Sequence, residues 1–363
     1  MTKRTRNWFY YRLSQALSVL LLFLCLTYAE SAGADKVKVY WGGVGFTGTW
    51  GERDQLYPYS SRFLCMPQSD CRAGNIDKMA RDRLAKKKFD NIDITLSMIE
   101  GIIMAVGITS EVLGITKDIV NKREKFQHVY RIFGSLMFYE FRSGKLIKNV
   151  PIIIRYTTHL DAPANDNEKF DIIKNLLSSD SFGINFFDIM YQQSKSVNLE
   201  ILPAKQTQIT EIRLSKNVSD IMEKRLKLAN FKTQVAQILE SEFVARADAP
   251  LIPSDIGGKG NVIGGKIKLR FADAEKELNL PEAAFKIGLD LRLFKKFQAI
   301  KGPQKTVCHA VAVTLRLADE MGEITNVKFA RVQNSCGIAS VEQVFDPTFY
   351  FPESLFALIQ NIT

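Results

Sequence analysis

The sequence has little of the chemistry on which most catalytic and metal sites depend. Only three histidines occur, His128, His159 and His309, and none belongs to an H-E-x-x-H zinc motif. The G-x-S-x-G pattern of serine hydrolases is also absent. His309 directly follows Cys308, but adjacent side chains in a strand point to opposite faces and do not form a simple dyad. We therefore expect no cofactor and no metal, and a protein that is not an enzyme.

Cysteines are also scarce, because the whole chain has five. Cys25 lies in an N-terminal apolar run that is expected to be removed, which leaves an even number, as paired disulfides require. Cys65 and Cys71 are close together in a turn-rich stretch, and Cys308 and Cys336 lie in two segments predicted to be neighbouring strands. Neither pair has C-x-x-C spacing, so structural disulfides are favoured over a metal site.

The second cysteine pair can be aligned by simple counting. If Asp319 pairs with Thr325 across a loop centred on Gly322, paired positions in the two strands sum to a constant. Cys308 and Cys336 have the same sum, so they are predicted to lie directly opposite each other, close enough for a disulfide.

The N-terminus lacks acidic residues up to Glu30 and carries four basic ones. An apolar run over residues 16–27 follows, shorter than the roughly 20 residues of a spanning helix. Small residues at 32–34 then fit a signal-peptidase site, so cleavage is expected before Asp35, with residues 1–34 as a signal peptide. The alternative is an uncleaved membrane anchor. The sequence thus predicts a periplasmic or extracellular protein.

Charge restricts the partners that such a protein would meet. Removal of residues 1–34 takes away four basic residues and one acidic residue, which lowers the net charge from +10 to +7. Positive charge attracts anionic envelope surfaces or an acidic envelope protein, and it is equally compatible with a basic surface kept for solubility. We expect peripheral rather than integral association with a membrane, and no nucleic-acid partner.

One segment, residues 72–88, holds most of this charge, with a net charge of +5. Helical spacing over part of it spreads basic side chains across most of an exposed face. The sequence therefore predicts an anionic-partner patch, with a solvated helix face as the alternative. Its members are Arg81, Arg83, Lys86, Lys87 and Lys88.

Two glycine-rich stretches superficially fit nucleotide-binding loops. In residues 260–266, Ile267 follows where a magnesium-binding hydroxyl is needed, and the next residues alternate like a strand. The G-x-G-x-x-G match at residues 43–48 follows a strand, but residues 49–51 are not expected to begin a helix. Neither is interpreted as a nucleotide site.

Hydrophobic patterning favours an α+β fold, with a β-hairpin plus helices in the first half and an antiparallel meander in the second. The clearest hairpin joins residues 129–141 to residues 145–157, and Pro151 in its second arm indicates an edge strand or a bulge. Residues 76–89 look helical, and the apolar stretch 94–115 is interpreted as core, part helix and part strand. We expect domains at residues 35–202 and 203–363, which may share one sheet.

In the second half, residues 209–214 read as a strand and residues 218–245 as one long amphipathic helix. The meander is predicted from segments 266–271, 285–294, 306–317 and 326–332, followed by a short helix at 352–362. The function that fits these features is a non-enzymatic exported protein of the cell envelope, acting in binding or assembly. The alternative is an extracytoplasmic hydrolase whose site residues converge only in three dimensions.

Overall fold

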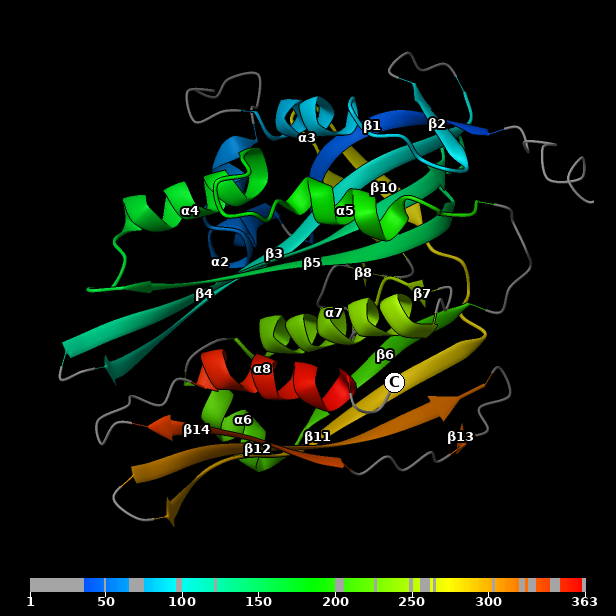
Figure 1. Ribbon diagram of the computed structural model, residues 1–363. Coiled ribbons are helices and arrows are strands. Elements are labelled where there is room, and N and C mark those ends of the chain that lie inside the picture. The colour runs from blue at the N-terminus through cyan, green and yellow to red at the C-terminus, as the bar shows by residue number, and fades with distance from the viewer. Residues whose placement is uncertain are drawn as a thin grey trace, which may run out of the picture. The chain divides into compact units, whose positions relative to one another are not determined.

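The computed structural model describes most of the chain after residue 35 (Figure 1). The predicted signal peptide, Cys65 and Cys71 lie outside the described residues. The described ranges are 36–48, 50–64, 75–95, 100–120, 123–199, 206–224, 227–247, 251–254, 262–263, 266–301, 304–319, 324–325, 331–339 and 347–360.

The first sheet has eight strands in the described chain, and its main path runs β10-β9-β1-β3-β4-β5. β1 and β3 are parallel, whereas β3, β4 and β5 form an antiparallel meander. β2 pairs with β1, and β8 pairs with β9. The strands are β1 (Val37–Thr47), β2 (Ile92–Thr95), β3 (Ile102–Val120), β4 (Arg123–Glu140), β5 (Leu146–Leu160), β8 (Val262–Ile263), β9 (Lys266–Arg270) and β10 (Glu275–Asn279).

The predicted hairpin is β4 and β5, both longer than expected at their outer ends. Gly144 turns the chain between them at φ +65°, in the left-handed region that glycine adopts without strain. β5 ends the strand path, so Pro151 lies in an edge strand as its missing N–H requires.

The apolar stretch at residues 94–115 was expected to be part helix, and for its described residues this is wrong. Residues 94–95 belong to β2, residues 100–101 form a bend and residues 102–115 belong to β3. Valine, isoleucine and threonine dominate it, and these β-branched residues pack well on a pleated surface.

Helices that follow β1 and helices that follow β5 cover one face of this sheet (Figure 1). Asn165 and Glu168 form a capping box that fixes the start of α4, with Asn165 Oδ1 accepting from the Glu168 N–H at 3.0 Å. The predicted helix at 76–89 is shorter, because α3 ends at Leu84. The helices are η2 (Trp50–Glu52), α2 (Arg53–Leu56), η3 (Ser60–Phe63), α3 (Ile76–Leu84), α4 (Asp166–Ser178) and α5 (Phe186–Ser194). Residues 49–51 were not expected to begin a helix. This expectation is wrong for Trp50 and Gly51, because η2 begins at Trp50 and α2 follows it.

The second sheet has six described strands, with the path β13-β12-β11-β6-β7 and with β14 paired to β12. β6 runs parallel to β11, whereas β12 is antiparallel to both β11 and β14. These strands are β6 (Thr207–Leu214), β7 (Leu251–Ile252), β11 (Phe285–Lys301), β12 (Gln304–Ala318), β13 (Ile324–Thr325) and β14 (Arg331–Ala339). Together with the first sheet they confirm an α+β fold.

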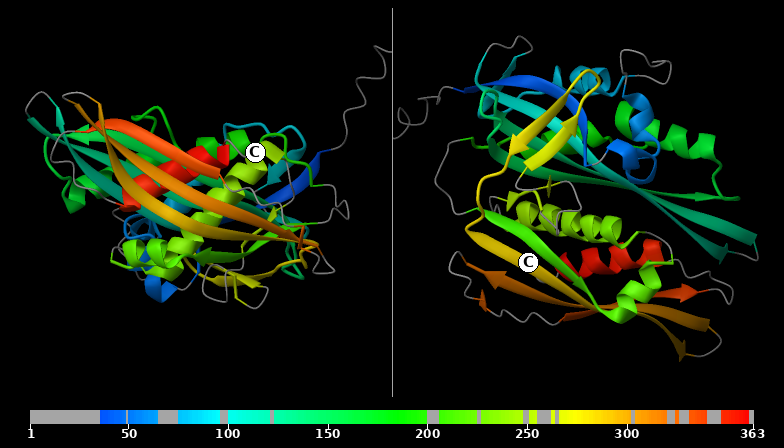
Figure 2. Two further views of the ribbon diagram at one scale, coloured as in Figure 1. Left: turned by 90° about the horizontal axis from the view of Figure 1, so that it is seen from below. Right: turned by 180° about the vertical axis from the view of Figure 1, so that it is seen from behind.

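The first of the four segments predicted for the meander, residues 266–271, does not belong to it. β9 does not join β11 and β12 but pairs with β1 of the first sheet, where Phe46 faces Arg270. Figure 2 (right) shows β9 and β10, in yellow, beside β1, in blue. The pairing brings residues from beyond position 203 into the first sheet, and the division at 202/203 stays a prediction.

The predicted helix 218–245 consists of two helices, α6 (Lys216–Met222) and α7 (Leu228–Ala247). Val218 and Met222 of α6 lie in the same hydrophobic core as Phe231 and Val235 of α7. The apolar periodicity therefore continues across the break, which is why it does not distinguish one helix from two.

α7 and the C-terminal helix α8 (Pro347–Gln360) lie between the two sheets (Figure 1). α7 is buried on its polar side too, where Gln237 and Glu240 are only 5% and 4% exposed. Ser110 of β3 donates its hydroxyl to Gln237 Oε1 at 3.0 Å across this contact. Of the helices in the described chain, none has the length and apolarity needed to cross a membrane.

Candidate functional site

The predicted basic patch lies on α3 and the turn after it, and two of its members are engaged within the protein. Arg83 forms ion pairs with Asp180 at 2.7 Å and with Asp188 at 3.3 Å. Lys87 pairs with the same Asp188 at 2.9 Å. These ion pairs join α3 and the turn after it to α5 and the loop before α5. They also neutralise positive charge that would otherwise be available to an anionic partner.

The remaining members of the patch are more open to solvent. Arg81 pairs with Asp77 one helical turn earlier at 2.5 Å, and its side chain is 49% exposed. Lys86 and Lys88 are both exposed. A partner attracted by charge would therefore meet Lys86 and Lys88 first.

The three histidines do not gather at one place. His309 lies on β12 in the second sheet, stacked on Tyr350 with ring centroids 4.0 Å apart. Burial, with a smaller effect of Lys296, lowers the pKa of His309 to about 4. His128 lies on β4, buried, and its Nε2 accepts from the Ala164 N–H at 3.4 Å. His159, on β5, is exposed. His309 is therefore a buried part of the core, 4% exposed.

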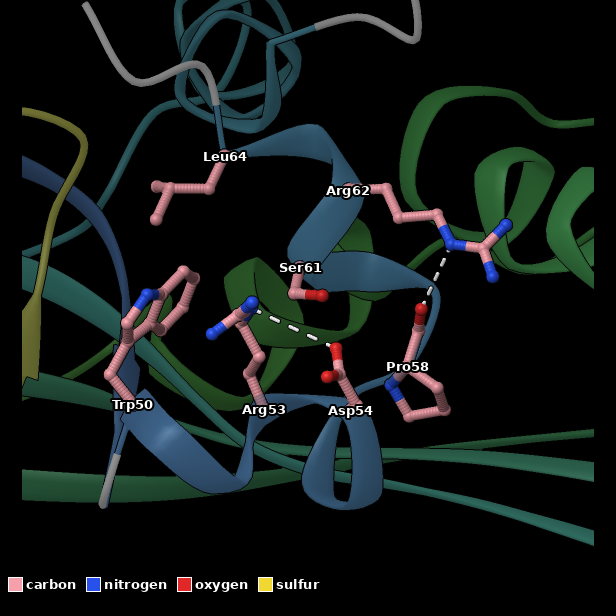
Figure 3. Close-up of a pocket in the computed structure, with 7 residues that line it drawn as sticks. All are labelled: Trp50, Arg53, Asp54, Pro58, Ser61, Arg62 and Leu64. Atoms are coloured by element: carbon pink, nitrogen blue, oxygen red, sulfur yellow. Dashed lines mark hydrogen bonds and ion pairs between the residues drawn. The ribbon is translucent and has the colours of Figure 1, made fainter. Parts of the chain in front are cut away.

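A different region of the first half of the chain carries a hollow. A hollow of about 430 Å³ opens on the connection from β1 to α3, within the range typical of ligand pockets (Figure 3). It is formed by η2, α2, η3 and the turns between them. Its lining residues are Trp50, Arg53, Asp54, Pro58, Ser61, Arg62 and Leu64.

An aromatic cluster fixes the base of this segment. Tyr57 is fully buried, and its ring centroid lies 4.7 Å from that of Phe46 at the end of β1. Its hydroxyl donates to the Thr47 carbonyl at 3.1 Å. Trp50 contacts both rings, at 5.8 Å from Phe46 and 6.1 Å from Tyr57. The indole is therefore held in place by rings that belong to the core.

Arg53 brings a cation to this indole. Its guanidinium carbon lies 5.4 Å from the Trp50 ring centroid, a cation–π distance. Arg53 Nε is 3.7 Å from Asp54 Oδ1, and the Asp54 side chain is 82% exposed. Figure 3 shows Trp50, Arg53, Asp54 and Ser61 around the same space. One wall of the hollow thus offers a flat ring, a donor and an acceptor.

Arg62 has a structural task on the opposite side. It donates from Nε to the Pro58 carbonyl at 3.0 Å and pairs with Asp166 of α4 at 3.2 Å. Its guanidinium carbon lies 5.0 Å from the Tyr59 ring centroid. In Figure 3 the guanidinium points away from Trp50. Arg62 therefore fixes the rim of the hollow more than it faces the interior.

Beneath the rim lies a buried carboxylate. Glu111 of β3 is 4% exposed, and it accepts hydrogen bonds from the N–H groups of Tyr59 at 3.2 Å and Ser60 at 2.5 Å. The Ser60 hydroxyl donates to the same carboxylate. This carboxylate joins the segment that carries the hollow to the first sheet.

Sequence reasoning missed the hollow. It interpreted residues 49–74 as turn-rich connection, because one-turn helices leave no periodicity to detect. A usable signal was the spacing of Trp50, Arg53 and Asp54, which places an aromatic ring one helical turn from a charged pair.

Comparison with known proteins adds little. No family model and no curated protein matches the sequence. Among solved structures, a minor lipoprotein from Acinetobacter baumannii aligns with 44% of this chain and 91% of its own, at 12% sequence identity and a TM-score of 0.21. Values this low carry no argument about fold or function. In the described part of the chain, no group of three or more His, Cys, Asp and Glu side chains is placed to hold a metal ion.

Proposed function

We propose that this chain is an exported binding component of the cell envelope, and that the hollow on residues 50–64 is its ligand site. The observation that carries the proposal is Arg53 stacked over Trp50 beside Asp54 in an open hollow. Export is supported by the basic N-terminus, the short apolar run and the small residues before Asp35. N-terminal sequencing of the exported protein tests this part, and material that keeps residues 1–30 contradicts cleavage.

The chemistry of the lining favours a saccharide as the ligand. A sugar ring has an apolar face that packs on an indole, and hydroxyl groups that both donate and accept hydrogen bonds. Arg53 supplies donors, Asp54 supplies acceptors and Ser61 supplies both. A purely anionic ligand would meet the Asp54 carboxylate, which opposes it. Cell-wall and outer-surface polymers of the envelope carry such sugars.

The same lining argues against the hydrolase alternative. Glycoside hydrolysis needs two carboxyl groups facing each other across the scissile bond. Among the lining residues in the described part of the chain, Asp54 is the one carboxylate. The lining therefore supports recognition of a sugar better than its cleavage.

Tryptophan fluorescence offers a direct test. After removal of residues 1–34 the remaining tryptophans are Trp41 and Trp50. Trp41 lies outside the hollow, where its Nε1–H donates to Asp77 Oδ1 at 2.9 Å, so Trp41→Phe leaves Trp50 as the reporter. We expect N,N′-diacetylchitobiose, an uncharged disaccharide, to change Trp50 emission in a saturable way. N-acetylglucosamine 6-phosphate, which has no amine, serves as the anionic comparison.

Variants make this test specific. Trp50→Ala, followed by calorimetry, and Asp54→Asn should each weaken disaccharide binding at least tenfold. The first removes the aromatic ring, and the second replaces one carboxylate oxygen, an acceptor, by an amide donor. Asp93→Asn, an exposed carboxylate on β2, is the matched control and should bind like wild type. Equal binding by Trp50→Ala and wild type contradicts the proposal. Tighter binding of the phosphorylated sugar than of the neutral one contradicts the role assigned to Asp54.

A further inference from the structure

Glu111 occupies a position where the sheet otherwise presents apolar side chains. Its cross-strand partner on β4 is Ile132, and the next partner on β5 is Ile154, both almost fully buried. Directly opposed residues point to the same face of a sheet. The carboxylate is therefore an isolated polar group in an apolar layer, and its hydrogen bonds all come from Tyr59 and Ser60.

The Tyr59–Ser60 turn is the centre of the segment that carries the hollow. Pro58 precedes it, and Ser61, Arg62 and Leu64 of the lining follow it. If the turn leaves β3, these groups lose their placement opposite Trp50. Glu111 thus acts on the hollow without contacting a ligand.

Few charges offset a negative charge on Glu111. Arg62 of η3 is the cation that lowers the pKa of Glu111, and the Arg62 side chain is 44% exposed and engaged with Asp166 of α4. The Tyr59 ring lies next to the carboxylate on the same segment. Tyr130 and His128 face this region from β4, Tyr156 from β5, and Glu168 and Lys169 from α4. No one of these supplies a buried cation beside Glu111.

We propose that Glu111 is a positioning residue that makes the hollow pH-sensitive: protonated, it keeps the Tyr57–Leu64 segment seated on β3, and ionised, it loosens that segment and weakens ligand binding. The identity of the site rests on the proposed function, but the loosening does not.

The direction follows from burial. Desolvation raises the pKa of Glu111 to about 7, against lowering effects of the Ser60 and Tyr59 hydrogen bonds and of Arg62. When the segment opens, water reaches the carboxylate and its pKa returns to about 4.5. At a pH between these two pKa values, opening of the segment therefore releases a proton. The equilibrium constant for opening rises about tenfold per pH unit from about pH 5 to pH 7 and then levels off.

Hydrogen exchange of residues 57–64, corrected for the intrinsic pH dependence of exchange, measures this opening without any ligand. The protection factors of these residues in wild type should fall about tenfold per pH unit between pH 5 and pH 7. Glu111→Gln should show no such dependence. Glu240→Gln is the matched control, because Glu240 is equally buried and accepts from the Ser254 N–H at 2.6 Å, away from the hollow. It should behave like wild type.

A second variant covers the case in which Glu111→Gln does not fold. Ser60→Ala keeps the carboxylate but removes a hydrogen bond that lowers its pKa, so the loss of protection should extend to higher pH. Flat corrected exchange in wild type, or an unchanged profile in Ser60→Ala, overturns the proposal. If exchange follows the prediction but no sugar binds, the pH response stands and the proposed function fails. If sugar binds while exchange is flat, the reverse holds.

Discussion

Cys308 of β12 lies directly opposite Cys336 of β14 in the antiparallel ladder between these strands. The turn that was used to predict this relationship pairs differently, because Thr325 faces Leu317 and not Asp319. The pairing of β12 with β13 is therefore shifted by two residues relative to the pairing of β12 with β14. The two cysteines are aligned by the β14 register.

A disulfide between Cys308 and Cys336 remains a prediction that this register supports. Opposed strand residues approach closely enough for an S–S bond, and closing a loop of this length stabilises the fold by about 3 kcal/mol on a loop-entropy model. We expect neither thiol to react with iodoacetamide in the denatured exported protein until reductant is added. Cys308→Ser should then expose Cys336 to alkylation. Free alkylation of both in wild type contradicts the bond.

The long strands were the most predictable part of the fold. The arms of β4 and β5 carry the aromatic and β-branched residues that define a hairpin, and Ser143-Gly144 marks the turn. β9 was assigned to the wrong sheet because its pattern specifies a strand but not a partner. The pairing of Phe46 with Arg270 joins residues far apart in sequence, and no local pattern contains it.

The candidate site was less predictable for a physical reason. Trp50 and Arg53 belong to one-turn helices whose conformation depends on Tyr57, Phe46 and other core contacts. The basic patch was predictable as a cluster of charge. Its neutralisation was not, because Asp188 approaches Arg83 and Lys87 only through the packing of α5 on α3.

A half-buried charge network in the second sheet should contribute to stability. Arg316 of β12 donates from Nη2 to Glu211 at 2.8 Å and makes two contacts with Asp290, at 3.0 and 3.2 Å. Its guanidinium lies over Gly288, where an added Cβ would be 2.9 Å from Nη2. Because the Arg316 side chain is only 18% exposed, Arg316→Met should lower the free energy of unfolding by about 2 kcal/mol.

Urea unfolding at neutral pH measures this loss. Arg213→Met is the control, since Arg213 contacts the same Glu211 but is 60% exposed. It should change the free energy of unfolding by less than about 0.5 kcal/mol. Similar losses in the two variants would show that the Arg316 network contributes no more than a surface pair.

Association with anionic envelope surfaces should depend on the exposed lysines of the basic patch. Lys86→Glu combined with Lys88→Glu should release the protein from isolated envelopes already at low salt. Exposed charges act over a longer distance there than at physiological salt, where the screening length is roughly 8 Å. Wild type should be released only as salt rises. Lys216→Glu with Lys224→Glu changes the same charge at exposed positions of α6 and of the turn after it, and should stay bound.

Fractionation of envelopes across a salt series measures this difference. Retention of the Lys86 and Lys88 variant at low salt, with no effect of salt on wild type, would make the basic patch a solvated surface. Release of both double variants alike would assign the attraction to net charge and not to this patch.

Two buried carboxylates should make the whole protein less stable as pH rises. Desolvation raises the pKa of Glu240 to about 7, as it does for Glu111, despite hydrogen bonds from Ser254 that lower it. In the unfolded chain both titrate near 4.5, so the folded state binds more protons between these values. Stability from each group is therefore fully present below about pH 4.5 and is lost as pH rises through 7, by about 3 kcal/mol per carboxylate.

Urea midpoints at pH 5, 6, 7 and 8 test the sign and the source of this loss. The stability of wild type should decline steadily from pH 5 to pH 7, and that of Glu240→Gln should decline by about 2 kcal/mol less over the same interval. Glu242→Gln is the matched control, because Glu242 lies on the same helix but is only half-buried, and it should follow wild type. A wild-type stability that rises from pH 5 to pH 7 would mean that carboxylates held in the ionised form dominate, and that the burial of Glu240 is relieved by water reaching its side chain.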